Sequence, residues 1–120
     1  MKVYLDNCAT TKPREEVIEE MVHILREEYG NPSSLHRLGF NAEKKIEVAR
    51  ENIAKFLNVN KDEIFFTSGG TESNNLAIQS VINKYLRLGK HIITTRIEHP
   101  SVLNVIKNYE QEGYDVTYLQ

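Results

Sequence analysis

The stretch FFTSGGTESNN, residues 65–75, decides the fold of this chain. An aromatic pair leads into two glycines, and a run of hydroxyl, carboxylate and amide side chains follows. The glycines predict a tight turn that joins a strand to a helix. A turn does not account for the polar run, so the same stretch is also a candidate binding loop.

Strands and helices alternate on both sides of this turn. Short apolar runs predict strands, and apolar side chains at helical spacing predict helices. In chain order we predict a strand at 63–67, a helix at 73–86, a strand at 91–95, a helix at 101–111 and a strand from 115. This order is typical of an α/β fold in which helices pack on a mainly parallel sheet.

Two amphipathic helices are predicted before the sheet, at 14–28 and 40–57, with a polar loop between them. We therefore expect two parts. Residues 1–60 form an N-terminal arm with two helices, and residues 61–120 form the first βαβαβ part of a larger domain. Three strands are fewer than the roughly five or six of an ordinary sheet, so we expect a piece of a longer protein.

The composition is that of a soluble globular protein, with 40% hydrophobic and 27% charged residues. No apolar run approaches the roughly 20 residues that span a bilayer, and the N-terminus lacks the features of an export signal. We expect a cytoplasmic protein that does not enter a membrane. The formal charge of −2, with both signs interspersed, argues against a nucleic-acid partner.

Metal and disulfide chemistry have little support in the sequence. The single cysteine, Cys8, cannot form an internal disulfide. The histidines are scattered and have no zinc-type spacing, at His23, His36, His91 and His99. We predict no metal site.

The polar run after the glycines lies where α/β proteins bind ligands, beyond the carboxyl end of a strand. It also opens a helix, whose first backbone N–H groups have no internal partners and carry a partial positive charge. Gly69 and Gly70 allow the backbone to approach an anion closely, and three hydroxyls can donate to it, those of Ser68, Thr71 and Ser73. The pattern predicts a cradle for one phosphate.

The class of phosphate ligand follows from what the loop lacks. It matches neither the dinucleotide fingerprint nor the nucleoside triphosphate loop, and no lysine follows to meet a second phosphate. A cofactor with a single phosphate is therefore favoured. The alternative is a simple turn in which Ser68 or Thr71 only caps the helix, and the local pattern does not separate the two.

A second polar loop, RIEHPSV at 96–102, leaves the carboxyl end of the next predicted strand. Parallel strands end at the same edge of a sheet, so this loop and the first should open on one crevice. His99 could stack on an aromatic ligand or move a proton. A histidine before a proline could equally cap a helix or lie at the surface, and Glu98 could orient the imidazole or be solvated.

Four motifs together resemble a known family. They are YLDNCATT at 4–11, GNPSSLHRLG at 30–39, FFTSGGTESNNLAI at 65–78 and IEHPSVL at 97–103. In this order and spacing they resemble the N-terminal part of the cysteine desulfurases of the iron–sulfur cluster assembly type, in the class V aminotransferase superfamily. The resemblance runs over essentially the whole chain. The form TSGGTESNN resembles the group that feeds general cluster assembly.

The resemblance implies a fold type I enzyme that depends on pyridoxal 5'-phosphate and acts as a homodimer. Such an enzyme takes sulfur from L-cysteine, releases L-alanine and passes the sulfur as a persulfide to an iron–sulfur scaffold or another acceptor protein. On this resemblance, Gly70 and Thr71 bind the cofactor phosphate. His99 stacks on the pyridine ring and assists proton transfer, which makes it both a cofactor-binding and a catalytic residue.

Three polar residues of the first two motifs are expected near the active-site cleft, Asn7, Asn31 and His36. Their side chains could equally fix the loops in which they lie. Cys8 does not correspond to the persulfide-forming cysteine of the family, which belongs to a loop far towards the C-terminus. We predict that Cys8 is a small buried thiol.

The resemblance also names groups that this chain does not contain. The lysine that binds the cofactor follows a histidine in the family, and none of the nine lysines here does so. We therefore expect residues 1–120 alone to be catalytically inactive. Two alternatives stay open: a selenocysteine lyase or related aminotransferase with the same phosphate cup, and a non-catalytic domain that binds a phosphorylated ligand or a cluster-assembly partner.

Overall fold

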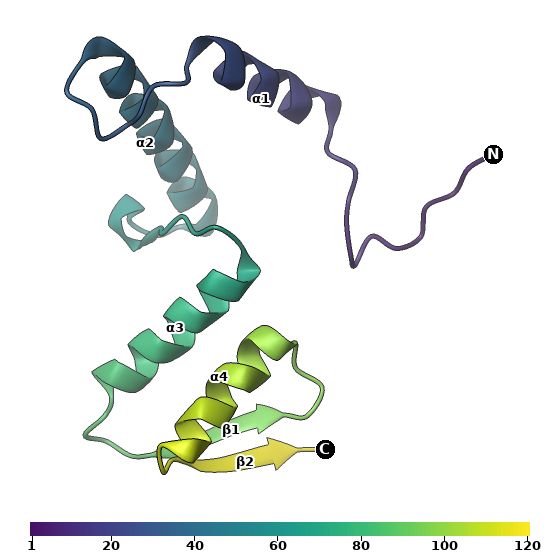
Figure 1. Cartoon of the computed structure of the whole chain (residues 1–120), viewed down its shortest axis with the longest axis vertical. Helices are drawn as coiled ribbons and strands as arrows, with labels where there is room; N and C mark the ends of the chain where they lie inside the picture. The colour runs from purple at the N-terminus through teal and green to yellow at the C-terminus, as the bar shows by residue number, and fades with distance from the viewer. The chain divides into compact units, whose positions relative to one another are not determined.

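The computed structural model describes residues 1–120 and contains four α-helices, one short 3-10 helix and two parallel strands (Figure 1). The predicted α/β class is confirmed. The chain divides into two compact units, Met1–Ile64 and Phe65–Gln120. The domain division at residue 60 stays a prediction. No helix combines the length and the apolar character that crossing a membrane requires.

The first unit contains α1 (Glu15–Glu27), α2 (Arg37–Leu57) and η1 (Lys61–Glu63). Both predicted helices are confirmed, although α2 begins three residues before the predicted start at residue 40. The earlier start has a local cause, because the Nδ1 atom of His36 accepts a hydrogen bond from the backbone N–H of Gly39 at 3.3 Å and so caps the helix.

The loop before α2 folds tightly against the first turn of that helix. A Cβ atom at Gly39 would lie 2.1 Å from the carbonyl oxygen of Ser34 and 2.7 Å from that of Asn31. A Cβ atom at Gly30 would lie 2.3 Å from the carbonyl oxygen of Leu38. The glycines of the GNPSSLHRLG motif therefore allow two stretches of backbone to pass at a distance that no other residue permits.

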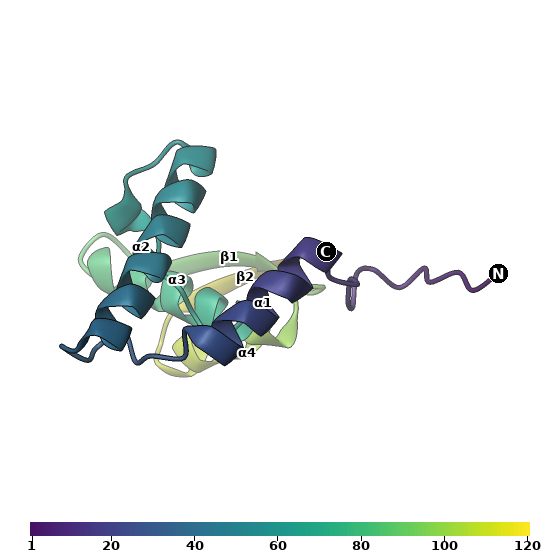
Figure 2. The same ribbon diagram turned by 90° about the horizontal axis from the view of Figure 1, so that it is seen from above.

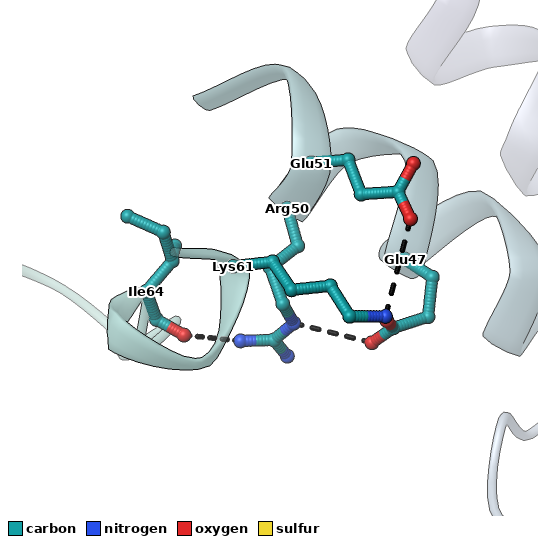
Figure 3. A network of polar contacts seen from close by, with 5 residues as sticks. All are labelled: Glu47, Arg50, Glu51, Lys61 and Ile64. Atoms are coloured by element: carbon teal, nitrogen blue, oxygen red, sulfur yellow. Dashed lines mark hydrogen bonds and ion pairs between the residues drawn. The ribbon is translucent and has the colours of Figure 1, made fainter. Parts of the chain in front are cut away.

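A group of charged side chains joins α2 to the 3-10 helix (Figure 3). The ammonium of Lys61 lies 2.9 Å from Glu47 and 3.9 Å from Glu51, and Arg50 lies 3.2 Å from Glu47. Arg50 also donates to the backbone carbonyl of Ile64. The hydrogen bond from Lys61 lowers the pKa of Glu47. These pairs face solvent, so each contributes little to the stability of the fold. Their main effect is to fix the path of the chain after α2.

The second unit contains α3 (Gly70–Lys84), β1 (His91–Thr95), α4 (Pro100–Gln111) and β2 (Asp115–Leu119). The two strands pair in parallel, with His91 opposite Asp115 and Thr95 opposite Leu119, and Figure 2 shows them side by side from a second direction. Both strands and both helices of this unit were predicted. Gly113, with a φ of 88°, ends α4 in a left-handed conformation that favours glycine.

The strand predicted at 63–67 is wrong. Glu63 is the last residue of η1, and the residues after it pair with no strand, because the only sheet is formed by β1 and β2. Ile64 has extended backbone angles, but Phe65 and Phe66 are 72% and 50% exposed. An apolar run favours an extended backbone, whereas a strand also needs a hydrogen-bonding neighbour. The second unit is therefore αβαβ and not βαβαβ.

The most buried side chains of the second unit lie on α4, where Val105 and Ile106 are 5% and 3% exposed. This helix packs against α3 and contacts β2. An open groove of about 560 Å³ runs between α3, α4 and β1, and its lining is mostly aliphatic. In the first unit the buried positions are small, Gly39, Ala42 and Ala54.

The close backbone approach at Gly39 generates the first prediction. We expect Gly39→Ala to lower the free energy of unfolding by about 1–3 kcal/mol, because the new methyl group meets two carbonyl oxygens that cannot both move away. Gly89→Ala is the matched control, since a Cβ atom there has no neighbour within 4 Å. Chemical denaturation followed by circular dichroism measures both variants. Equal stabilities for the two would contradict the tight loop.

Candidate functional site

The start of α3 presents backbone donors without acceptors. Gly69 precedes the helix, and no side chain caps it. The N–H of Ser73 donates to the carbonyl of Gly69 at 3.1 Å, whereas the N–H groups of Gly70, Thr71 and Glu72 have no acceptor within the chain. A Cβ atom at either glycine would have no neighbour within 4 Å, so the space in front of the helix is open. The alternative in which Ser68 or Thr71 caps α3 is wrong.

The loop before α3 is held by its own side chains. The carboxylate of Glu72 accepts from the hydroxyl of Ser68 at 2.6 Å and from its backbone N–H at 2.7 Å. These two bonds, the hydroxyl first, hold the pKa of Glu72 below its usual range. The hydroxyls of Thr67 and Ser73 lie 2.7 Å apart. Of the three hydroxyls expected to face a phosphate, Ser68 and Ser73 therefore serve the loop, and that of Thr71 stays available.

The start of α4 is capped by His99. Its Nδ1 atom accepts from the backbone N–H of Ser101 at 3.1 Å and lies 2.9 Å from the hydroxyl of Ser101. Pro100 occupies the first position of the helix, as its fixed φ favours. The interpretation of His99 as a helix cap is correct, and it engages only one of the two ring nitrogens. Glu98 accepts from the hydroxyl of Thr95 at 3.0 Å, and the bonds of the His99 ring go to Ser101, so of the two alternatives for Glu98 the exposed loop carboxylate is the one observed.

Two amides of α3 connect this helix to the start of α4. The Nδ2 group of Asn74 donates to the hydroxyl of Ser101 at 2.9 Å. The Nδ2 group of Asn75 lies 2.7 Å from the carbonyl of Thr71 and 3.4 Å from that of Ser101. Ser101 is 8% exposed and is the buried polar residue of the chain. The open start of α3 and the histidine are thus joined through one buried serine, within a single compact unit.

Asn74, Asn75 and Ser101 were not assigned a role from the sequence. The available signal was the polar run after the two glycines, which a turn leaves unexplained. The structure accounts for that run residue by residue: Glu72 and Ser73 hold the preceding loop, and the two asparagines reach the neighbouring helix.

The remaining candidates lie in the first unit. Asn31 accepts from the backbone N–H of Ser33 at 2.9 Å, and His36 caps α2, so both side chains fix the loop in which they lie. Proximity of Asn7, Asn31 and His36 to an active-site cleft stays a prediction. Cys8 is exposed, so the prediction of a buried thiol is wrong. No group of three or more His, Cys, Asp or Glu side chains is placed to hold a metal ion.

An open helix start joined to a histidine-capped helix is a candidate site for a small phosphorylated ligand. The chain belongs to the aminotransferase class-V family, whose sequence model matches residues 3–120. It is 51% identical to the cysteine desulfurase IscS of Dictyoglomus turgidum over 118 residues and 47% identical to that of Clostridium botulinum. The chain spans about 30% of the length of these relatives, and each alignment covers 98% of the chain.

Solved structures give the same result. A NifS-like protein matches with a TM-score of 0.90 and 45% identity, over 99% of this chain and 33% of that one. SspA in complex with cysteine matches with a TM-score of 0.82 and 42% identity, over 92% and 32%. DndA from Streptomyces lividans matches at 0.79 and 38%, over 98% and 33%. The resemblance drawn from four motifs is confirmed, as is the fold of pyridoxal phosphate-dependent enzymes of this family.

The bond between Glu72 and Ser68 generates a prediction on pH. A carboxylate with a lowered pKa contributes stability above its ordinary pKa of about 4.3 and loses it as the pH falls through the lower folded value. We expect Glu72→Gln to be less stable than the wild type at neutral pH and to lose less stability on acidification. Glu43→Gln is the control, because Glu43 is an exposed carboxylate in the middle of the first half of α2. The free energy of unfolding of all three proteins is measured by denaturation at neutral pH and at acidic pH values below the ordinary pKa of Glu. The same pH dependence in all three would contradict the hydrogen-bonded Glu72 carboxylate.

Proposed function

We propose that this chain supplies the phosphate cup and the ring-stacking histidine of a cysteine desulfurase that uses pyridoxal 5'-phosphate. The observation that carries the proposal is the pair of contacts on Ser101, from Asn74 and with His99, which links the free donors of α3 to the imidazole. A ligand with a phosphate at one end and an aromatic ring at the other fits these two features.

The start of α3 suits the phosphate. Three backbone N–H groups without acceptors, at Gly70, Thr71 and Glu72, combine with the positive end of the helix dipole. The exposed hydroxyl of Thr71 adds a fourth donor. The carboxylate of Glu72 already accepts hydrogen bonds from the hydroxyl and the backbone N–H of Ser68, in the loop before the helix. This donor set is neutral and compact, which matches one phosphate better than two.

The imidazole of His99 suits the cofactor ring. The side chain is exposed, and the ring is fixed at Nδ1 by the start of α4. A ring held at one edge keeps a flat face for stacking on a pyridine and leaves its second nitrogen for a polar group of the substrate. When bound, the cofactor would act as an electron sink for the substrate carbon that bears the amino group.

The proposed reaction converts L-cysteine and a protein thiol into L-alanine and a protein persulfide. The names of the relatives support this substrate, and one structural neighbour contains cysteine. The cofactor-binding lysine and the persulfide-forming cysteine would lie outside residues 1–120. The proposal includes a cytoplasmic homodimer and an iron–sulfur scaffold or similar acceptor protein for the sulfur.

A related enzyme with the same cup is the second candidate, because the matched family is broader than the desulfurases. Selenocysteine lyases and aminotransferases would share the contacts described above. Assays of the intact protein with cysteine, selenocysteine and an amino acceptor separate the three activities. Alanine and persulfide from cysteine support the desulfurase.

The phosphate cup predicts a loss of cofactor affinity in Thr71→Ala. One hydrogen bond to a charged phosphate contributes about 1–3 kcal/mol, so we expect binding in the intact protein to weaken by that amount. Titration with pyridoxal 5'-phosphate, followed by absorbance, measures the change. Thr71→Ser keeps the hydroxyl and should bind normally, as should Ser80→Ala further along α3. Unchanged affinity in Thr71→Ala counts against the cup.

The stacking histidine predicts a different signature for His99→Ala. We expect turnover to fall more than cofactor affinity, because the ring acts on the reacting groups in addition to contacting the cofactor. His99→Asn is the informative companion, since asparagine is a good helix cap and preserves the start of α4. Alanine production should be lost in both variants. Turnover at the wild-type level in His99→Asn would remove the imidazole from the reaction.

A further inference from the structure

The hydrogen bonds around His99 determine which ring nitrogen carries the proton. A backbone N–H can only donate, and the N–H of Ser101 points at Nδ1 from 3.1 Å. Nδ1 must therefore be the acceptor in this arrangement. In a neutral imidazole one nitrogen accepts and the other bears the hydrogen, so the hydrogen lies on Nε2.

The hydroxyl of Ser101 has a direction as well. The amide N–H of Asn74 can only donate, and it lies 2.9 Å from the oxygen of Ser101. That oxygen thus accepts from Asn74, and its own hydrogen is free to point at Nδ1, 2.9 Å away. At 8% exposure Ser101 has little access to water, so protein partners must satisfy its hydroxyl.

We propose that Asn74 and Ser101 are positioning residues that hold His99 as the Nε2–H tautomer, so that neutral His99 presents a hydrogen-bond donor, and not a base, to the bound ligand. The inference rests on the proposed function for the identity of that ligand. The three groups form one chain of donors, from the Asn74 amide through the Ser101 hydroxyl to the ring, and each bond polarises the next. No acceptor within the chain engages Nε2, which leaves it for a lone pair of the substrate or cofactor.

The tautomer is measured directly by nuclear magnetic resonance on intact protein labelled with ¹⁵N in the histidine ring. Long-range ¹H–¹⁵N correlations distinguish a protonated from an unprotonated ring nitrogen, and they require neither turnover nor bound cofactor. For neutral His99 we expect an unprotonated Nδ1 and a protonated Nε2. A protonated Nδ1, or an even mixture of tautomers, would overturn the inference.

Two variants test the positioning residues. Ser101→Ala removes the hydroxyl donor, and Asn74→Ala removes the group that orients this hydroxyl while leaving the Ser101 contact in place. In each the backbone N–H at position 101 still donates to Nδ1, so we expect the ring signals to move part of the way toward the mixture of tautomers of an unconstrained histidine. Ser101→Thr keeps a hydroxyl and should restore the wild-type signals, and Ser80→Ala should leave them unchanged. Wild-type ring signals in both alanine variants would show that the backbone cap alone sets the tautomer and would refute the roles of Asn74 and Ser101.

Turnover supplies the second measurement. Loss of one neutral hydrogen bond predicts a fall in kcat of about 2- to 10-fold in Ser101→Ala, with cofactor affinity unchanged because Thr71 and the start of α3 are intact. The two hypotheses fail separately. Ring signals as expected without any desulfurase activity would sink the proposed function alone, and a Nδ1-protonated His99 in an active desulfurase would sink this inference alone.

Discussion

A single buried hydroxyl, that of Ser101, connects the parts of the candidate site. It accepts from Asn74 on α3 and lies against the ring of His99 at the start of α4. A buried polar group must be hydrogen-bonded or it destabilises the fold, so this residue constrains both helices at once. This constraint sets the distance between the open start of α3 and the imidazole. It therefore also sets the length of any ligand that contacts both.

The two helix starts solve the same local problem in opposite ways. Each α-helix begins with N–H groups that lack internal partners. At α4 the His99 side chain accepts one of them, whereas at α3 a glycine stands in the capping position and the donors stay free. The side chains around α3 are nevertheless organised, because Glu72 and Ser73 bind the preceding loop and not the helix start. The loop before α3 is thus held in place by its own hydrogen bonds, whereas the N–H groups at the start of α3 stay free to bind a ligand.

Most helices and strands of the second unit could be predicted because the spacing of apolar side chains along the chain indicates them locally. The strand at 91–95 matches β1 in both bounds, and the helix predicted at 101–111 differs from α4 by one residue. The error at 63–67 arose because an apolar run indicates a preference for extended backbone but does not show that a neighbouring strand is there to pair with it. The helix α3 starts at Gly70, ahead of the predicted residue 73, with Gly69 in the capping position and the backbone N–H of Ser68 bonded to the carboxylate of Glu72.

The site was predictable only as far as its loops. Both loops were singled out because each was expected to follow a strand of one sheet, although only the loop at 96–102 follows a strand in the structure. The resemblance carried by the four motifs then selected Gly70, Thr71 and His99. Ser101, Asn74 and Asn75 could not be predicted, because a hydrogen bond between residues 26 or 27 positions apart depends on how two helices pack. Cys8 shows the converse, since the burial expected for a lone thiol is a tendency and the residue is exposed.

The central claim is that one ligand contacts the start of α3 and His99 together. Titration of isotope-labelled intact protein with pyridoxal 5'-phosphate tests it directly, through the backbone amide signals of Gly70 and Thr71 and the ring signals of His99. We predict that all three sets of signals shift along one saturation curve with a single dissociation constant. Amide shifts at Gly70 and Thr71 with no change at His99, or two separate saturation curves, would contradict the account.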